Sequence, residues 1–118
     1  MGKSKKMSLL PRAEDAIVEE SKVRGYLLNL DHDDGKHKAE FFSRFGFSPD
    51  RWQELAEAMR SHAIRNDVTK TVVSPYGVRY VVEGPLKAPD GREPGVRSVW
   101  IIDEGQERPR LVTAYPLG

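Results

Sequence analysis

The spacing of hydrophobic residues changes near Asn66. Before this residue, apolar side chains recur three or four positions apart, which is the period of an amphipathic helix. After it, short runs of β-branched and aromatic residues alternate with polar ones and are separated by turn residues, a pattern typical of strands. The sequence therefore predicts helices first and a sheet second.

Two helices are predicted before residue 46. A short one covers residues 20–28, and a second covers residues 35–45 and ends at Gly46. Asp33 or Asp34 would cap the second helix by accepting its free amide protons. One side of this helix presents Lys38, Phe41, Phe42 and Phe45.

A third helix has the clearest pattern. It begins at Ser48-Pro49-Asp50, where a hydroxyl can cap, proline fits the first turn and an acid lies near the positive end of the helix dipole. It ends near Asn66. Its apolar stripe consists of Trp52, Leu55, Ala56, Met59 and Ala63.

The remaining chain predicts four strands joined by short turns. They cover residues 68–73, 78–84, 96–103 and 110–116, and Pro116 closes the last one at an edge. The predicted fold class is α+β, with about three N-terminal helices packed on one face of a four-stranded antiparallel β-meander. The other face of the sheet is then free for a ligand.

Composition limits the class of protein. The chain has 118 residues, of which 38% are hydrophobic and 31% charged, and its net charge of +1 neither marks nor excludes a nucleic-acid binder. We expect a basic flexible arm (residues 1–9) and a single domain (residues 10–118) in the cytoplasm, without membrane contact. The lack of cysteine excludes disulfides, thiolate metal sites and cysteine nucleophiles.

The stretch DHDDGKHKAEFF (31–42) is rich in possible metal ligands. A calcium loop needs an acid at its twelfth position, but the twelfth residue from Asp31 is Phe42. His32 and His37 are five apart and have no matching ligand pair elsewhere. No metal or other cofactor is predicted, and the aspartates are interpreted as turn and cap residues.

His37 follows Lys36 and precedes Lys38 in the first helical turn, where amide protons and lysines favour an anion. It is either a proton-exchanging site residue or a surface histidine. Lys38 is either its partner or a side chain that extends past the edge of the core. His62 borders the apolar stripe of the third helix and is interpreted as a packing residue.

Polar side chains also occur inside the predicted strands. In the last strand, Leu111, Thr113 and Tyr115 share one face, which is either a site or a consequence of β-propensity. Arg79 and Arg97 would contact phosphates or form salt bridges with Glu83 or Asp103.

Four stretches together resemble a small bacterial family of uncharacterised domains, some free-standing and some at the ends of large secreted toxin proteins. They are GYLLN (25–29), GKHKAEFF (35–42), VRSVWIID (96–103) and PRLVTAYP (109–116), and the resemblance covers residues 10–116. The layout is also similar to the metal-independent ribonuclease superfamily that includes barnase, EndoU nucleases, colicin and contact-inhibition toxins, and RelE-type toxins.

This second resemblance implies cleavage of RNA by its own 2′-hydroxyl and a cognate antitoxin or immunity protein as inhibitor. Such enzymes use a histidine or lysine from the helical part and a Thr-x-Tyr-like pair on a late strand. The catalytic positions would be His37, Lys38, Thr113 and Tyr115, with Arg97 and Arg79 binding the substrate. The second essential histidine or catalytic glutamate of many relatives has no clear counterpart.

The alternative is a non-catalytic module that binds a protein through the open face of the sheet. Thr113 and Tyr115 would then be interface residues, since tyrosine is enriched at binding hot spots. The two hypotheses differ in geometry. A nuclease requires His37, Thr113 and Tyr115 to converge on one phosphate-sized space, whereas a binding module does not.

Overall fold

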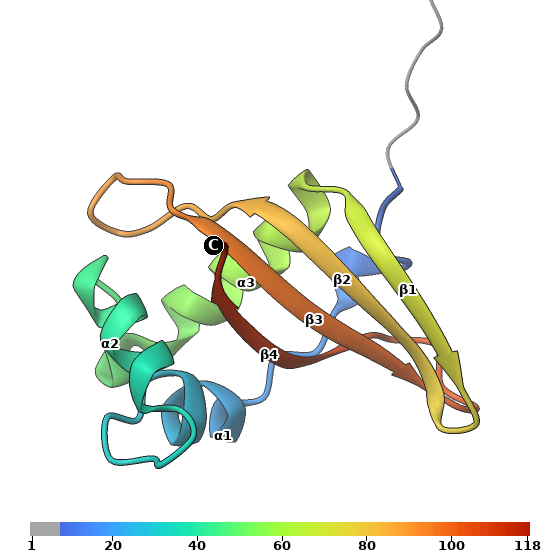
Figure 1. The fold of residues 1–118 in the computed structure, drawn as a ribbon, viewed down its shortest axis with the longest axis horizontal. Coiled ribbons are helices and arrows are strands. Elements are labelled where there is room, and N and C mark those ends of the chain that lie inside the picture. The colour runs from blue at the N-terminus through green and yellow to red at the C-terminus, as the bar shows by residue number, and fades with distance from the viewer. Residues whose placement is uncertain (1–7) are drawn as a thin grey trace, which may run out of the picture.

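The computed structural model describes residues 8–118 and confirms the predicted α+β class (Figure 1). Its helical part consists of η1 (Ala13–Asp15), α1 (Glu20–Lys22), a π-helical turn η2 (Val23–Leu27), α2 (Lys36–Arg44), η3 (Pro49–Arg51) and α3 (Trp52–Arg65). The sheet that follows consists of β1 (Val68–Ser74), β2 (Gly77–Pro85), β3 (Gly95–Asp103) and β4 (Arg110–Pro116). None of the helices in the described part is long and apolar enough to cross a membrane.

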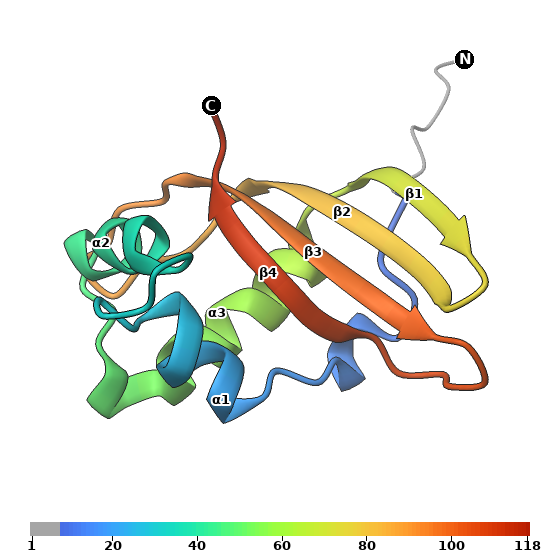
Figure 2. The same cartoon turned by 60° about the horizontal axis from the view of Figure 1, so that its bottom comes forward.

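The strands form one antiparallel sheet in the order β1-β2-β3-β4, as a meander requires. Helix α3 crosses one face of this sheet and contacts β2 and β3 (Figure 1). The segment from α1 to α2 lies beside β4, at the edge of the sheet (Figure 2). Within residues 8–118, the face opposite α3 is therefore open, except where α1 and α2 reach the edge of β4. We call this the outer face.

The hydrophobic core lies between α3 and the sheet. Leu55, Met59 and Ala63 of the predicted stripe are fully buried against Trp100 of β3. Trp52, at the start of α3, is only partly buried. The 3.6-residue period of α3 therefore predicted the face that packs, although not how deeply its first turn is covered.

His62 connects the end of α3 to the sheet. Its Nε2 lies 3.0 Å from the carbonyl oxygens of Gly84 and Val96, so this nitrogen carries the proton. Its Nδ1 accepts a hydrogen bond from the Ser98 hydroxyl (2.9 Å), which in turn accepts one from Trp100 Nε1 (2.9 Å). Every polar group of this buried network has a partner, which confirms the predicted packing role.

The turn before α2 differs from the prediction. No carboxylate of Asp33 or Asp34 caps the helix. Instead His32 Nδ1 accepts hydrogen bonds from the backbone amides of Asp34 and Gly35, each at 3.0 Å. The imidazole is held for this role because its ring packs edge-on against Tyr26, with centroids 5.0 Å apart.

Two glycines set the limits of α2. A Cβ on Gly35 would lie 2.5 Å from the carbonyl oxygen of Tyr26, so only glycine lets α2 begin directly against η2. Gly46 has a φ of 101° and ends the helix, as predicted.

β4 contains one more residue than its partner strand requires. Leu111 and Thr113 are opposite two consecutive residues of β3, which leaves Val112 as a bulge. Leu111 and Ala114 are consequently both buried toward the helices, while Thr113 and Tyr115 point to the outer face. The prediction that Leu111 shares a face with Thr113 is wrong, because the bulge shifts the alternation by one residue.

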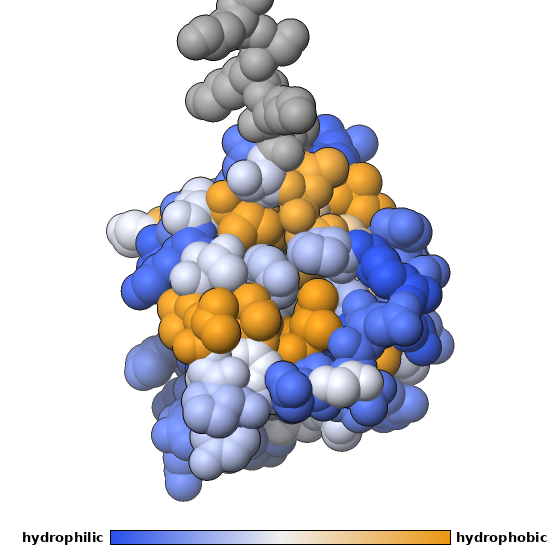
Figure 3. Space-filling view, turned by 90° about the vertical axis from the view of Figure 1, so that its right-hand side faces the viewer, coloured by the Kyte–Doolittle hydropathy of each residue, from blue (hydrophilic) through white to orange (hydrophobic). Residues whose placement is uncertain are grey.

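β1 forms the other edge of the sheet. Its first amide, at Val68, donates a hydrogen bond to the carbonyl of Ser8 (2.6 Å), and Val73 near its end is 76% exposed. At this end of the molecule, apolar patches interrupt the charged surface (Figure 3). Of the arm predicted at residues 1–9, residues 1–7 lie outside the part that the structure describes.

Candidate functional site

Polar side chains from both halves of the chain meet where η2 and α2 approach the outer face of β4. Tyr26 is at the centre of this group. The ammonium nitrogens of Lys22 and Lys38 each lie 5.3 Å from the centroid of its ring, within the range of a cation–π contact. We refer to Tyr26, Lys22, Lys38 and Thr113 as the Tyr26 cluster.

The cluster changes the acidity of the phenol. Partial burial alone would raise the pKa of Tyr26, but the Thr113 hydroxyl and the ammonium groups of Lys38 and Lys22 outweigh it. The pKa of Tyr26 therefore lies below its ordinary value. A phenol in such a setting exchanges its proton more readily at neutral pH, which suits proton transfer.

Thr113 supplies a buried hydroxyl without a partner. Its Oγ1 is shielded from solvent and forms no hydrogen bond within the described residues. The hydroxyl is close enough to lower the pKa of Tyr26, yet the geometry of the two groups falls short of a hydrogen bond. An orphaned polar atom next to a phenol that contacts two ammonium groups can form a hydrogen bond with an added ligand.

His37 points away from this cluster. Its side chain is 91% exposed, and its Nδ1 lies 3.5 Å from Glu40 Oε1 on the solvent side of α2. The expected convergence of His37 with Thr113 and Tyr115 is not found. Consecutive residues of a helix point about 100° apart, so His37 and Lys38 lie on different sides of α2. Lys38 does reach Tyr26, and it packs at the core edge as its place on the apolar stripe predicted. The catalytic role of His37 stays a prediction.

Tyr115 and Arg97 lie together farther along the outer face. The Arg97 guanidinium carbon is 5.5 Å from the centroid of the Tyr115 ring, and Arg97 Nε donates a short hydrogen bond to Glu83 Oε2. Tyr115 and Glu83 together raise the pKa of Arg97. The three side chains border a hollow of about 430 Å³ that is completed by Thr69, Lys70 and Val81.

Arg79 is separate from both groups. It lies in another hollow of the outer face, close to the β1–β2 turn, together with Asp103 and Arg110. Asp103 is already paired with Arg110, through bonds of 2.8 and 3.0 Å, and the guanidinium lowers its pKa. Arg79 is exposed and has no ion pair with a described carboxylate. Of the two predicted salt-bridge partners, Glu83 pairs with Arg97, whereas Asp103 pairs with neither predicted arginine.

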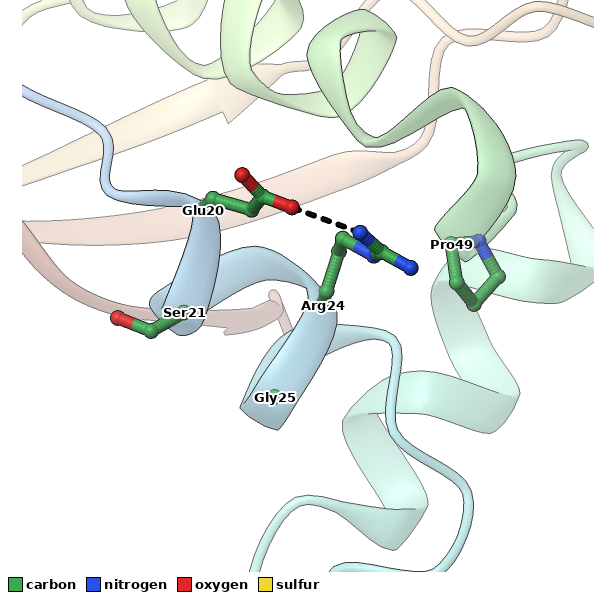
Figure 4. Close-up of a pocket in the computed structure, with 5 residues that line it drawn as sticks. All are labelled: Glu20, Ser21, Arg24, Gly25 and Pro49. Atoms are coloured by element: carbon green, nitrogen blue, oxygen red, sulfur yellow. Dashed lines mark hydrogen bonds and ion pairs between the residues drawn. The ribbon is translucent and has the colours of Figure 1, made fainter.

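Other parts of the surface are less suited to chemistry. A hollow of about 590 Å³ beside α1 is bordered by Glu20, Arg24 and Pro49 (Figure 4). There Arg24 and Glu20 neutralise each other through a 2.7 Å ion pair, so no charge is left for a ligand. Among residues 8–118, no three histidine, aspartate or glutamate side chains are arranged to hold a metal ion.

Tyr26 was missed by sequence reasoning. It lies in the stretch GYLLN at 25–29, whose leucines predicted a buried helix face, and a tyrosine beside them gives no separate signal. Lys22 is four residues earlier on the same helical side, and that spacing is the only clue to the pair. The contact with Thr113 joins residues 87 positions apart, which no local pattern predicts.

Comparison with known proteins adds a family and a fold relative. No curated protein matches the sequence. The fold is similar to a chain in the solved structure of a contact-dependent growth inhibition toxin–immunity protein complex from Klebsiella pneumoniae 342. The TM-score is 0.68 with 19% sequence identity, and the match covers 86% of this chain and 99% of that chain. At this identity the similarity shows a shared fold. One family model matches residues 9–118, which is nearly the whole chain. The chain therefore belongs to the family described as domain of unknown function DUF6883.

Proposed function

We propose that this protein is a metal-independent endoribonuclease of toxin type, which acts in the cytoplasm and is inhibited by a cognate antitoxin or immunity protein. One observation carries the proposal: the buried, unpartnered hydroxyl of Thr113 lies beside a phenol of lowered pKa, and the ring of this phenol contacts the ammonium of Lys38. Such a group of donors suits an anion that gains charge during a reaction, as a phosphate does.

The reaction needs no metal, because RNA contains its own nucleophile. The 2′-hydroxyl loses its proton and its oxygen bonds to the adjacent phosphorus. The bond from phosphorus to the 5′-oxygen then breaks, and that oxygen takes up a proton. The products are a 2′,3′-cyclic phosphate and a free 5′-hydroxyl. The protein must move two protons and stabilise the extra phosphate charge.

The Tyr26 cluster can perform most of these steps. Lys38 would stabilise the developing phosphate charge, and Thr113 would donate a hydrogen bond to a phosphate oxygen. Tyr26, whose pKa is lowered by its neighbours, would give its proton to the leaving 5′-oxygen. His37 remains the predicted acceptor of the 2′-hydroxyl proton, and it would reach the ribose where the RNA strand crosses the first turn of α2.

The fold relative supports the choice of partner. Its chain comes from a complex of a toxin with an immunity protein. In this chain the Tyr26 cluster and Tyr115 both lie on or beside the outer face, where a protein bound across the sheet would cover them together. A single inhibitor would thereby block both the reacting groups and the path of the RNA.

Incubation with total RNA in excess EDTA tests the proposal. We expect discrete cleavage that leaves DNA intact and that is lost in Tyr26→Phe, which removes only the phenol. His37→Ala in the same assay decides whether the exposed histidine takes part. Intact RNA after incubation with the folded wild-type protein would contradict the proposal.

A protein-binding module is the second candidate, and the exposure of His37 favours it. With this ring turned to solvent, the geometry expected of a nuclease is incomplete. The outer face would then bind a partner through Tyr115, without chemistry. In that case Tyr26→Phe would leave every measurable property of the protein unchanged except its stability.

A further inference from the structure

We propose that Glu83, Arg97 and Tyr115 form a subsite for guanine, so that RNA is cut next to guanosine. We call this group the Glu83 subsite. The inference rests on the proposed function, because it assumes that the ligand is RNA. It goes further by stating which base the protein selects.

The subsite spans three adjacent strands, β2, β3 and β4. Glu83 of β2 and Arg97 of β3 are direct partners in the antiparallel register, and Arg97 is in turn opposite Tyr115 of β4. Their side chains therefore stand side by side on the outer face. The side chains of Glu83 and Arg97 are 28% and 35% exposed, so both are partly desolvated but open to a ligand.

A cross-strand ion pair is a common structural feature, but here several hydrogen-bond donors and acceptors of the two side chains are not used by the pair. The bond joins Nε of Arg97 to Oε2 of Glu83. This bond does not involve the two Nη groups of the arginine or the second carboxylate oxygen, although the guanidinium also interacts with Tyr115. A ligand in the hollow can therefore find adjacent acceptors on Glu83 and adjacent donors on Arg97.

Guanine is the base that matches this order of groups. Its Watson–Crick edge presents two neighbouring N–H donors, which a carboxylate accepts in pairs, followed by the O6 acceptor, which a guanidinium serves. Adenine and cytosine each present an acceptor where the second donor would be needed. Uracil has one donor between two acceptors. Each of these three bases would therefore place a hydrogen-bond acceptor against the ionised carboxylate.

The position of the subsite agrees with the Tyr26 cluster. Tyr115 and Thr113 are two residues apart on one strand, which places their Cα atoms about 7 Å apart on the same face. This distance is comparable to the separation of a base from its own phosphate in a single strand. Guanine bound beside Tyr115, which offers an aromatic surface, would bring its 3′-phosphate toward Thr113 and Lys38.

Binding of the four nucleoside 3′-monophosphates to the full chain, measured by calorimetry or amide NMR shifts, tests this assignment without requiring cleavage. We expect guanosine 3′-monophosphate to bind about 10- to 100-fold more tightly than the other three. Glu83→Gln replaces one acceptor by a donor while keeping the size of the side chain, and it should remove this preference. Glu93→Gln, an exposed glutamate in the β2–β3 connection, serves as the matched control and should keep it.

The outcomes separate the two proposals. Selective binding of the guanosine nucleotide that Glu83→Gln abolishes supports the subsite, even if RNA remains intact and the ribonuclease proposal fails. Equal binding of all four nucleotides, or binding of none, overturns the subsite. If wild-type protein cleaves RNA, the subsite additionally requires cuts on the 3′ side of guanosine, and cuts after every base would overturn it.

Discussion

The two faces of β3 and β4 differ in whether their buried polar groups have hydrogen-bond partners. On the helix side, His62, Ser98 and Trp100 satisfy one another and the backbone completely. On the outer side, Thr113 keeps a buried hydroxyl without a partner among residues 8–118, beside the Tyr26 phenol whose ring contacts two lysines. A satisfied network fixes the structure, whereas an unsatisfied one beside charged groups is prepared for a ligand. Changes on the helix side should therefore affect stability, and changes on the outer side should affect chemistry.

The largest effect is expected from Lys38→Met. This change removes one of the two charges at the Tyr26 ring but keeps most of the apolar length of the side chain, so RNA cleavage should fall about 10²- to 10³-fold. Stability should change by less than about 1 kcal/mol, which is the size of an exposed cation–π contact. Initial rates on a short RNA and a urea melt measure the two quantities.

Lys36→Met is the matched control for this prediction, since Lys36 has the same charge, lies two residues away and is exposed. It should leave cleavage within about threefold of wild type. If both variants lose activity equally, the general positive charge of α2 matters rather than its contact with Tyr26.

His62→Ala should produce the opposite result. It leaves the Ser98 hydroxyl and two carbonyl groups without their partner and opens a cavity, which together destabilise the fold by about 2–4 kcal/mol. Equilibrium unfolding in urea measures this loss. His37→Ala should change stability by less than about 0.5 kcal/mol, because its ring is in solvent. Equal losses in the two variants would contradict the structural role of His62.

The same histidine predicts a pH dependence of stability. Burial lowers the pKa of His62, so below its ordinary value of 6.5 the unfolded chain binds a proton that the folded chain does not. Stability should be complete above pH 6.5 and fall as the pH drops toward the lowered folded value. His62→Ala should lack this step. The pKa of Asp103 is lowered by Arg110, so its contribution to stability is present above pH 3.8 and is lost only as the pH falls below that value.

Thr113→Val tests the role of the unpartnered hydroxyl on the outer face. Removing an unpartnered buried hydroxyl should raise the free energy of unfolding by about 1 kcal/mol. Cleavage should fall by roughly tenfold, because the phosphate loses a donor. Thr113→Ser keeps the hydroxyl and should retain activity. A valine variant that is both less stable and fully active would show that the hydroxyl belongs to the fold.

The smallest effect is expected from Arg79→Ala, at the far end of the outer face. If Arg79 contacts only an RNA phosphate, its loss should weaken binding equally for all sequences. The slope of log K against log salt concentration should decrease by about 0.7. Fluorescence anisotropy at several salt concentrations measures both changes. An altered preference among bases would place Arg79 in base recognition instead.

The order of helices and strands could be predicted from the sequence, because hydrophobic periods and turn residues are properties of short local segments. Three signals each depend only on residues close by in the sequence: the period of α3, the glycine that ends α2 and the proline-containing turn after β1. The cap of α2 could not be predicted, since it depends on an imidazole held in place by Tyr26.

The candidate site was only partly predictable for a similar reason. Thr113, Tyr115, Arg97 and Lys38 were identified by residue type, and each lies on or beside the outer face. The side of α2 on which His37 lies depends on which neighbour the helix packs against. That neighbour, Tyr26 in η2, is defined by a close approach at Gly35 rather than by any repeat in the sequence.

The bulge at Val112 also affects how relatives should be aligned. A related chain that keeps this residue but pleats it regularly would have no bulge in β4, and its Thr-x-Tyr pair would turn toward the helices. Identical letters in the last strand can therefore stand for opposite faces. Within this family, a Thr-x-Tyr pair is comparable to Thr113 and Tyr115 only where β4 has the same bulge, or where it lacks both the bulge and the one extra residue.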